Sequence, residues 1–182
     1  MEELLSIKLR DPLAELLGAA PDGLLSYSYA DAVKLAGHSC PTVAGAYRVT
    51  CEALARLYPE EIPVRGAVRV ELRGAAHEGT VGVVAMVAGF ITGAAGEGGF
   101  KGIAGHYARR GLLVFEAPIS AQLRFTRLDS GASVEADLPQ APPDENIKRL
   151  LRGALLPGAS PAHRQAFARA WQQRVESILG AR

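Results

Sequence analysis

The spacing of apolar residues along the chain separates predicted helices from predicted strands. In residues 41–57 apolar side chains recur at intervals of three and four, as at Val43 and Tyr47. That period predicts a helix that begins with the proline of this segment, since proline is favoured at the first helical position. Two shorter helices are predicted before it, at residues 12–17 and 27–36, and a glycine follows each of them.

Alternation of apolar and polar residues predicts strands in the middle of the chain. Residues 64–73 alternate in this way, which is typical of a strand that is buried on one face. Residues 121–128 and 132–138 also alternate, and the Asp-Ser-Gly between them predicts a hairpin. Residues 111–117 (GLLVFEA) are mostly apolar and predict a buried strand.

The apolar segment at residues 77–93 is predicted to form a helix rather than strands. Small residues recur along one side of it at intervals of three and four: Gly82, Ala85, Gly89 and Gly93. A stripe of this kind lets another backbone approach closely. Two further helices are predicted near the C-terminal end, one that begins at Pro161 and one before it with an apolar stripe of Ile147, Leu150, Leu151, Ala154 and Leu155.

The order of these elements predicts an α+β fold. We expect a mostly antiparallel sheet packed against helices, with two C-terminal helices. Residues 1–140 are expected to form the α+β domain, and residues 141–182 a helical extension packed on the same core. Residues 138–146 (LPQAPPDEN) have the composition of a linker.

Composition and charge narrow the class of protein. Hydrophobic residues make up 48% of the 182 residues and charged residues 21%, which is typical of a globular domain. The net charge of +1 gives no large basic field, so neither nucleic acid nor a membrane is expected as a partner. No apolar run is long enough to span a bilayer, and charged residues interrupt any signal sequence. We therefore expect a cytoplasmic protein.

A histidine and a cysteine, His38 and Cys40, stand two residues apart just before the helix predicted at Pro41. If Pro41 is the first helical residue, Cys40 is the N-cap, where free N–H groups and the helix dipole favour a partly exposed thiolate. An imidazole and a thiolate in one connector suit zinc and similar divalent metals. The alternative is structural, with a buried Cys40 and a hydrogen-bonded His38. The residues themselves leave both alternatives open.

Further ligands must come from other parts of the chain. His77 is the favoured third ligand, because the connector between a predicted strand and the apolar helix could bring it inward. Glu78 and Glu97 are candidate carboxylate partners, and His106 is a further histidine candidate. A Cys40–His77 pair would also suit nucleophilic catalysis, although nothing in the sequence orients it.

The glycine-rich segment of residues 92–102 (TGAAGEGGFKG) is expected to form a loop beside a small-molecule pocket. It fits neither the P-loop, since no Gly-Lys-Ser/Thr follows, nor the dinucleotide fingerprint, whose last glycine is missing. Glycines permit close approach by a ligand, and Lys101 could counter an anionic group.

Two segments resemble the FmdE-like family, which is named after a component of formylmethanofuran dehydrogenase. AGHSCPTVAGAYR, residues 36–48, is similar to the family's Gly-His-x-Cys-Pro motif and to the apolar helix that follows it. FITGAAGEGGFKGIAGHYARRGLLVF, residues 90–115, is similar to the family's second block. That block runs from a buried helix into a Thr-Gly-Cys, a glycine- and lysine-bearing loop, an Asp-Tyr pair and a strand.

The resemblance implies that His38 and Cys40 bind a divalent metal such as zinc, in an FmdE-like metal-binding domain. Ala94 stands where the family has its second cysteine, so a redox pair of thiols is not implied. A site of His38, Cys40 and His77 is favoured instead. The cysteine-rich zinc ribbon that often ends family members has no counterpart here.

The second block also implies candidates for a pocket or for groups that support the metal ligands. Thr92 matches the family's Thr-Gly, and His106 and Tyr107 stand at its Asp-Tyr pair. With Glu78, Glu97 and Lys101, which were named above from the sequence itself, the full set of candidates is Glu78, Thr92, Glu97, Lys101, His106 and Tyr107.

Two functional hypotheses follow from the sequence. The first is a zinc-binding protein that acts on a small molecule, where an open metal position would polarise a carbonyl or activate water. The second is a non-catalytic accessory subunit or carrier that binds a metal or cofactor for a redox complex, with the C-terminal helices as its docking surface. The small-residue stripe would suit a homodimer as well as a monomer.

Overall fold

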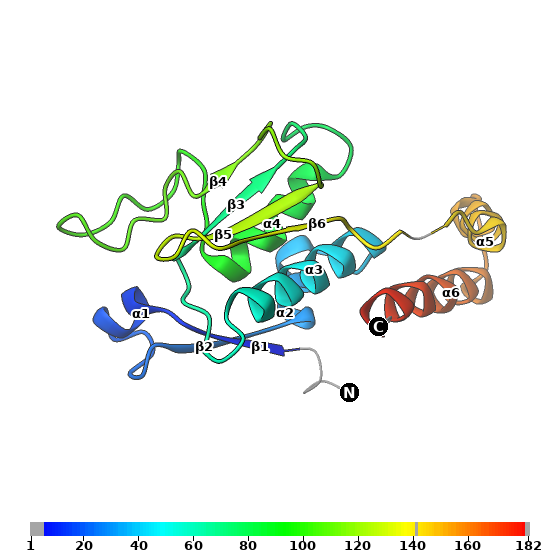
Figure 1. Ribbon diagram of the computed structural model, residues 1–182. Helices are drawn as coiled ribbons and strands as arrows, with labels where there is room; N and C mark the ends of the chain where they lie inside the picture. The colour runs from blue at the N-terminus through cyan, green and yellow to red at the C-terminus, as the bar shows by residue number, and fades with distance from the viewer. Residues whose placement is uncertain (1–5, 141, 181–182) are drawn as a thin grey trace.

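A four-stranded sheet packed against helices forms the body of the molecule (Figure 1), and the computed structural model describes residues 6–140 and 142–180. The strands are β1 Ser6–Arg10, β2 Leu24–Ser28, β3 Val68–Leu72, β4 Leu113–Val114, β5 Leu123–Arg127 and β6 Ser133–Ala136. The helices are α1 Pro12–Leu16, α2 Tyr29–Ala36, α3 Pro41–Leu57, α4 Val81–Thr92, α5 Glu145–Leu155 and α6 Pro161–Gly180. The strand order β4-β3-β5-β6 and the packed helices confirm the α+β prediction.

Alternation along β3 places the core on one face of the sheet. Val68, Val70 and Leu72 are buried, whereas Arg69 between them is exposed. Phe125 on β5 is paired with Val70 and is also fully buried. Burying a large apolar side chain stabilises a fold by about 1.5–3 kcal/mol. α3 and α4 pack side by side against the sheet, so the core lies between the sheet and these helices.

A second sheet, formed by β1 and β2 in antiparallel pairing, was not predicted from the sequence. Residues 27–28, predicted to start a helix, belong to β2, and α2 begins only at Tyr29. Ser28 explains this boundary. Its side chain accepts the Asp31 N–H, and the Asp31 carboxylate accepts the Ser28 N–H, which together form a capping box.

β4 differs from the buried strand predicted for residues 111–117. It contains two residues, it pairs parallel with β3, and Val114 is 36% exposed. Gly111 before it and Glu116 after it have positive φ values of 74° and 55°. Such left-handed backbone cannot continue a strand, so the pairing stops on both sides.

α4 confirms the helix predicted from the small-residue stripe. A Cβ added at Gly82 or Gly89 would lie 2.7 Å from the carbonyl oxygen of Ala76 or Ala94, respectively. The backbone that approaches the stripe at these two glycines is therefore the chain's own, just before and just after the helix. Gly93 ends α4 in the left-handed conformation, with φ 77°.

Both predicted C-terminal helices are present, as α5 and α6. α6 packs on α3 through the buried Val175 and Ile178, and α5 packs against α6 with Ile147. Leu155, predicted to lie on the inner stripe of α5, is instead 74% exposed, because the helix ends there and Leu156 continues in extended backbone. Within residues 6–140 and 142–180, no helix combines the length and the apolar composition needed to cross a membrane.

Candidate functional site

Cys40 is the N-cap of α3, as predicted from the proline after it. Its backbone is extended, with φ −152° and ψ 165°, and its Sγ accepts a hydrogen bond from the Val43 N–H at 3.5 Å. The residue is buried, at 9% exposed, which is what the structural alternative expects and less than the metal-binding hypothesis expects. The sulfur therefore lies at the positive end of a 17-residue helix, where core and surface meet.

His38 is exposed, and one of its ring nitrogens is already bonded. Nδ1 lies 3.0 Å from the carbonyl oxygen of Ala36. Because a carbonyl oxygen only accepts, Nδ1 carries the proton, and Nε2 of the neutral ring keeps its lone pair. Histidines that bind metals have this arrangement, with the other ring N–H donated to a carbonyl or carboxylate. The structural alternative also expects a hydrogen-bonded His38. The bond orients the ring and leaves its second nitrogen for a ligand.

Ser39, between the two candidate ligands, is held by two helices. Trp171 on α6 donates its indole N–H to the Ser39 carbonyl oxygen at 2.9 Å. The Ser39 hydroxyl donates to Gln172 Oε1 at 3.1 Å and lies 2.8 Å from the hydroxyl of Tyr29. Neighbouring residues of α6 therefore fix the connector of residues 37–40 from the outside.

His77 and Glu78 lie in the loop between β3 and α4, and both are exposed. The Glu78 carboxylate accepts the Ala75 N–H at 3.2 Å within that loop. Glu78 also borders a cavity of about 130 Å³ beside Gln122, the residue before β5. Ligand pockets usually have about 300–1,000 Å³, so this cavity suits a few water molecules or a small fragment.

Thr92 is fully buried at the end of α4. Its hydroxyl donates to the Ala88 carbonyl oxygen at 2.8 Å and accepts the Ala94 N–H at 3.2 Å. The first bond is the one that a helical threonine often makes to the carbonyl four residues earlier, and the second holds the backbone just after the helix. In this structure Thr92 closes α4.

Glu97, Lys101, His106 and Tyr107 lie on the loop of residues 93–112, and all four are exposed. The loop projects from the body between α4 and β4 (Figure 1). Backbone hydrogen bonds hold its shape. At one of its turns, Ile103 and His106 bond each other's backbone at 2.8 and 2.9 Å.

The two residues inside that turn, Ala104 and Gly105, have positive φ values of 50° and 84°. This combination is typical of the two-residue turns that close tight hairpins. Tyr107 also has positive φ, at 61°, which is uncommon for a residue with a side chain. The loop predicted from its glycines is therefore present, as a defined hairpin-like projection.

His38 and Cys40 lie in one connector, two residues apart, and the other predicted residues lie on separate loops and at the end of α4. The start of α3 lies near α6, whereas the loop of residues 93–112 projects from the opposite end of the molecule (Figure 1). In the part of the chain that the structure describes, no three His, Cys, Asp or Glu side chains are grouped so that they could hold a metal ion.

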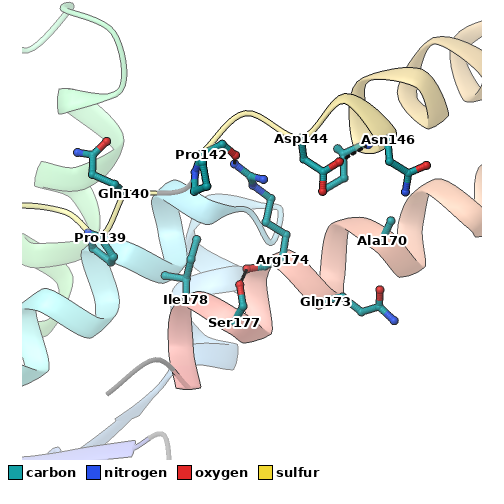
Figure 2. A pocket seen from close by; sticks show the side chains of 11 residues that line it. Pro139, Gln140, Pro142, Asp144, Asn146, Ala170, Gln173, Arg174, Ser177 and Ile178 are labelled. Carbon is teal, nitrogen blue, oxygen red and sulfur yellow. Dashed lines mark hydrogen bonds between the residues drawn. The ribbon is translucent and has the colours of Figure 1, made fainter.

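An open cavity of about 510 Å³ lies between the linker and α6 (Figure 2). Arg174 on α6 reaches toward the linker and donates to the carbonyl oxygen of Pro142. Asp144 accepts the Ile147 N–H at 3.1 Å and so caps α5. None of the residues predicted for a site lines this cavity, and these polar groups join the linker to the two helices.

A buried ionic cluster, which was not predicted from the sequence, joins three distant parts of the chain. Asp11 accepts from Arg109 at 2.7 Å with one carboxylate oxygen and from Arg65 at 3.0 Å with the other. The same carboxylate accepts the N–H groups of Leu13 and Ala14 at 3.0 and 3.2 Å as the N-cap of α1. The Asp-Pro pair at residues 11–12 signals the cap, but no local pattern signals the arginines.

Arg65 also closes the far end of α4. Its guanidinium donates to the carbonyl oxygens of Phe90 and Ile91 at 2.9 and 3.2 Å, where the negative end of the helix dipole favours a cation. Gly66 gives Arg109 its space, since a Cβ there would lie 1.5 Å from the Arg109 Nη1. The cluster thus ties β1, α1, α4 and the loop of residues 93–112 together.

Electrostatics keep the Asp11 carboxylate charged. Burial on its own would raise the pKa of Asp11, but the hydrogen bonds from Arg65 and Ala14 and the charge of Arg109 outweigh it and hold the pKa below its ordinary value. Burial lowers the pKa of Arg109, and the charge of Asp11 opposes that shift. With its carboxylate oxygens bonded inside the protein, Asp11 supports the fold.

Comparisons with known proteins add no further guide to the site. No protein-family model, curated protein or solved structure matches this chain. The likeness to the FmdE-like family therefore stays a prediction from the two segments quoted above, and function has to be argued from the residues themselves.

Proposed function

We propose that this protein binds a divalent metal ion, zinc or a similar metal, through His38 and Cys40 at the start of α3. The observation that carries the proposal is the hydrogen bond from His38 Nδ1 to the Ala36 carbonyl oxygen. It favours the tautomer in which Nε2 keeps its lone pair and could bind a metal, two residues from a sulfur at the positive end of a helix. The resemblance to the FmdE-like family supports the same pair.

The chemistry of the two donors fits such an ion. Zinc takes neutral imidazole nitrogen and thiolate sulfur readily, and the thiol must lose its proton before it binds. A helix N-terminus stabilises the resulting negative charge. Metal binding is therefore expected to release a proton and to weaken as the pH falls.

Two protein ligands leave coordination positions to be filled. Zinc sites have four ligands when structural and three protein ligands when catalytic. His77 is the third ligand that we propose from the sequence, and a small molecule or a second chain is the other source. Incomplete coordination suits an accessory subunit or carrier that shares its ion with a partner, and this is the role we favour.

A metal-assisted enzyme is the second candidate, because Glu78 borders a cavity and could act as an acid or base there. When bound, the ion would supply a Lewis acid for a carbonyl or an activated water. The carrier role and the enzymatic role differ in what Glu78 does, since only the second needs its carboxylate.

Metal analysis of the purified full chain tests the proposal. We expect one metal ion per chain in protein prepared without chelators, and loss of most of it in Cys40→Ser and in His38→Ala. Cys51→Ser is the matched control. Burial raises the pKa of Cys51 to about 12, so that thiol stays protonated and is not expected to bind. Wild-type protein without metal, or full occupancy in Cys40→Ser, would overturn the proposal.

Two additional variants separate the finer claims. Full metal occupancy in His77→Ala would exclude His77 as the third ligand and would leave the proposal for His38 and Cys40 intact. Cobalt-loaded protein should show a sulfur-to-metal absorption band that shifts when imidazole fills an open position. If Glu78→Gln leaves the pH dependence of that shift unchanged, the enzymatic candidate loses its support and the carrier remains.

A further inference from the structure

Charge is distributed unevenly along the chain. Residues 145–182 contain 7 Lys or Arg and 2 Asp or Glu, whereas residues 1–144 contain 13 Lys or Arg and 17 Asp or Glu. The C-terminal arm, defined as α5 and α6, is therefore basic, and the rest of the molecule is acidic. The net charge of +1 conceals this division.

The outward face of α5 is both basic and apolar. Leu151 and Arg152 lie three and four residues after Lys148, and Leu155 lies four and three residues after them, which places all four on one stripe of the helix. Arg149 is exposed beside this stripe. Leu151 and Leu155 are 37% and 74% exposed, and the adjoining Leu156 is 63% exposed. Clustered exposed leucines with a charged border are typical of a protein interaction site.

A patch of the opposite character lies on the body. We call it the acidic patch, and it consists of Glu60, Glu61, Ile62, Leu128 and Asp129. Ile62 and Leu128 are each 48% exposed. Arg127 joins its two segments, because its guanidinium donates to Glu61 at 3.2 Å and to Asp129 at 2.6 Å.

Arg127 neutralises only part of this patch, because its single positive charge pairs with two of the three carboxylates, Glu61 and Asp129. Its side chain is only 14% exposed, and its guanidinium lies over the ring of Tyr58 at 3.9 Å. The three carboxylates of the patch are exposed and lie beside two exposed apolar side chains in the sequence. The patch thus combines negative charge with exposed apolar side chains, which complements the basic and apolar outward face of α5.

The two surfaces lie at opposite ends of one molecule. The turn between β5 and β6, which carries Leu128 and Asp129, is at one end, and α5 is at the other (Figure 1). The bond from Arg174 to Pro142 and the cap at Asp144 hold the arm on its linker (Figure 2). One chain cannot bring its own two surfaces into contact in this arrangement.

We propose that the outward face of α5 binds the acidic patch of a second copy of this chain, and that the second copy does the same in return. Two molecules lying antiparallel make this contact twice, which gives a closed two-fold dimer. Charge complementarity selects the partner: Lys148, Arg149 and Arg152 face carboxylates. The leucines favour a protein over nucleic acid, since Ile62 and Leu128 can desolvate them and phosphates cannot.

Sedimentation of the full chain, stripped of metal, tests this inference independently of the proposed metal site. We expect a dimer at about 0.1 M salt and weaker association at about 1 M, because the Debye length falls from about 10 Å to about 3 Å. Arg149→Glu with Arg152→Glu, and Glu60→Lys with Glu61→Lys, should each weaken the dimer by about tenfold or more. Lys8→Glu with Lys34→Glu is the control of equal charge change, and it should leave the dimer intact.

Mixing the two reversed variants is the decisive step. In a mixed pair both contacts again join opposite charges, so we expect a mixed dimer at a 1:1 ratio. A wild-type monomer at low salt would overturn the proposal, as would a dimer that both reversals leave unchanged. Growth into longer assemblies would overturn the two-fold geometry. A monomer that retains nucleic acid through α5 would show that the partner of this face is nucleic acid and not protein.

Discussion

Two polar regions of the molecule differ in how far their side chains are bonded within the protein. One is the cluster of Asp11, Arg65 and Arg109, and the other is the connector of His38 and Cys40. Both carboxylate oxygens of Asp11 are bonded within the protein, and the residue is 3% exposed. His38 has one ring nitrogen bonded and is exposed. A buried carboxylate with both oxygens bonded inside the protein stabilises the fold, whereas a fixed group with an unused atom at the surface is available to a ligand. Variants in the two regions should therefore separate stability from binding.

Asp11→Ala should have the largest effect on stability. It removes the shared acceptor of two guanidinium groups and leaves buried positive charge, which typically costs about 3–5 kcal/mol. Urea unfolding measures the loss. Asp22→Ala is the control, because that carboxylate accepts a single exposed backbone N–H from Leu24 and should cost about 1 kcal/mol or less. Folded Asp11→Ala that no longer binds metal would break the comparison.

The acid stability of the protein should depend strongly on Asp11. Its pKa is lowered in the folded state, so its contribution is present above the unfolded value of about 3.9 and is lost as the pH falls through the folded value. The stability difference between wild type and Asp11→Asn should therefore be largest near neutral pH and should shrink below about pH 4. Unfolding curves between neutral and acidic pH check this, and a constant difference would contradict it.

Trp171→Phe should have a smaller effect. It keeps the apolar contact of the ring but removes the donor to the Ser39 carbonyl oxygen, and one such bond is worth about 1 kcal/mol. Because that bond fixes the connector, we also expect weaker metal binding, measured as a higher dissociation constant. Phe167→Leu is a control on the same helix. Equal metal affinity in both variants would show that α6 does not position the ligands.

Cys40→Ser should have the smallest effect on stability and the clearest effect on binding. Serine is among the preferred N-cap residues, so stability should change by less than about 1 kcal/mol. The soft sulfur ligand is lost at the same time, and so is metal. Cys51→Ser should show the reverse, with lower stability and unchanged binding, since Cys51 packs against the core. Stability and metal content measured on both variants check the contrast.

The local part of the site could be predicted from the sequence. Pro41 marks the start of α3, and this places Cys40 at the cap with no knowledge of the rest of the chain. The predictions of the β5–β6 hairpin and of helix α4 are also confirmed. Both could be made because the periodic pattern lies within a short stretch of sequence. Signals of this kind act over one or two turns.

Contacts between distant segments could not be predicted in this way. Arg65 and Arg109 bond a residue 54 and 98 positions away, and nothing in the local pattern around either arginine indicates that partner. The parallel pairing of β4 with β3 could not be predicted either, because the two residues of β4 are too few to show a period. The placement of His77 relative to His38 is also a long-range question, which is why the third ligand stays a proposal.

Trp171 has an additional consequence, because it is the single tryptophan of the chain. Its indole N–H is bonded to the connector, so indole emission excited at the red edge of the absorption band comes from one position beside the candidate ligands. A change in that bond alters the polarity around the ring and shifts the emission wavelength. The unlabelled protein thus contains its own optical probe, and stopped-flow mixing can follow events at the start of α3 as they occur.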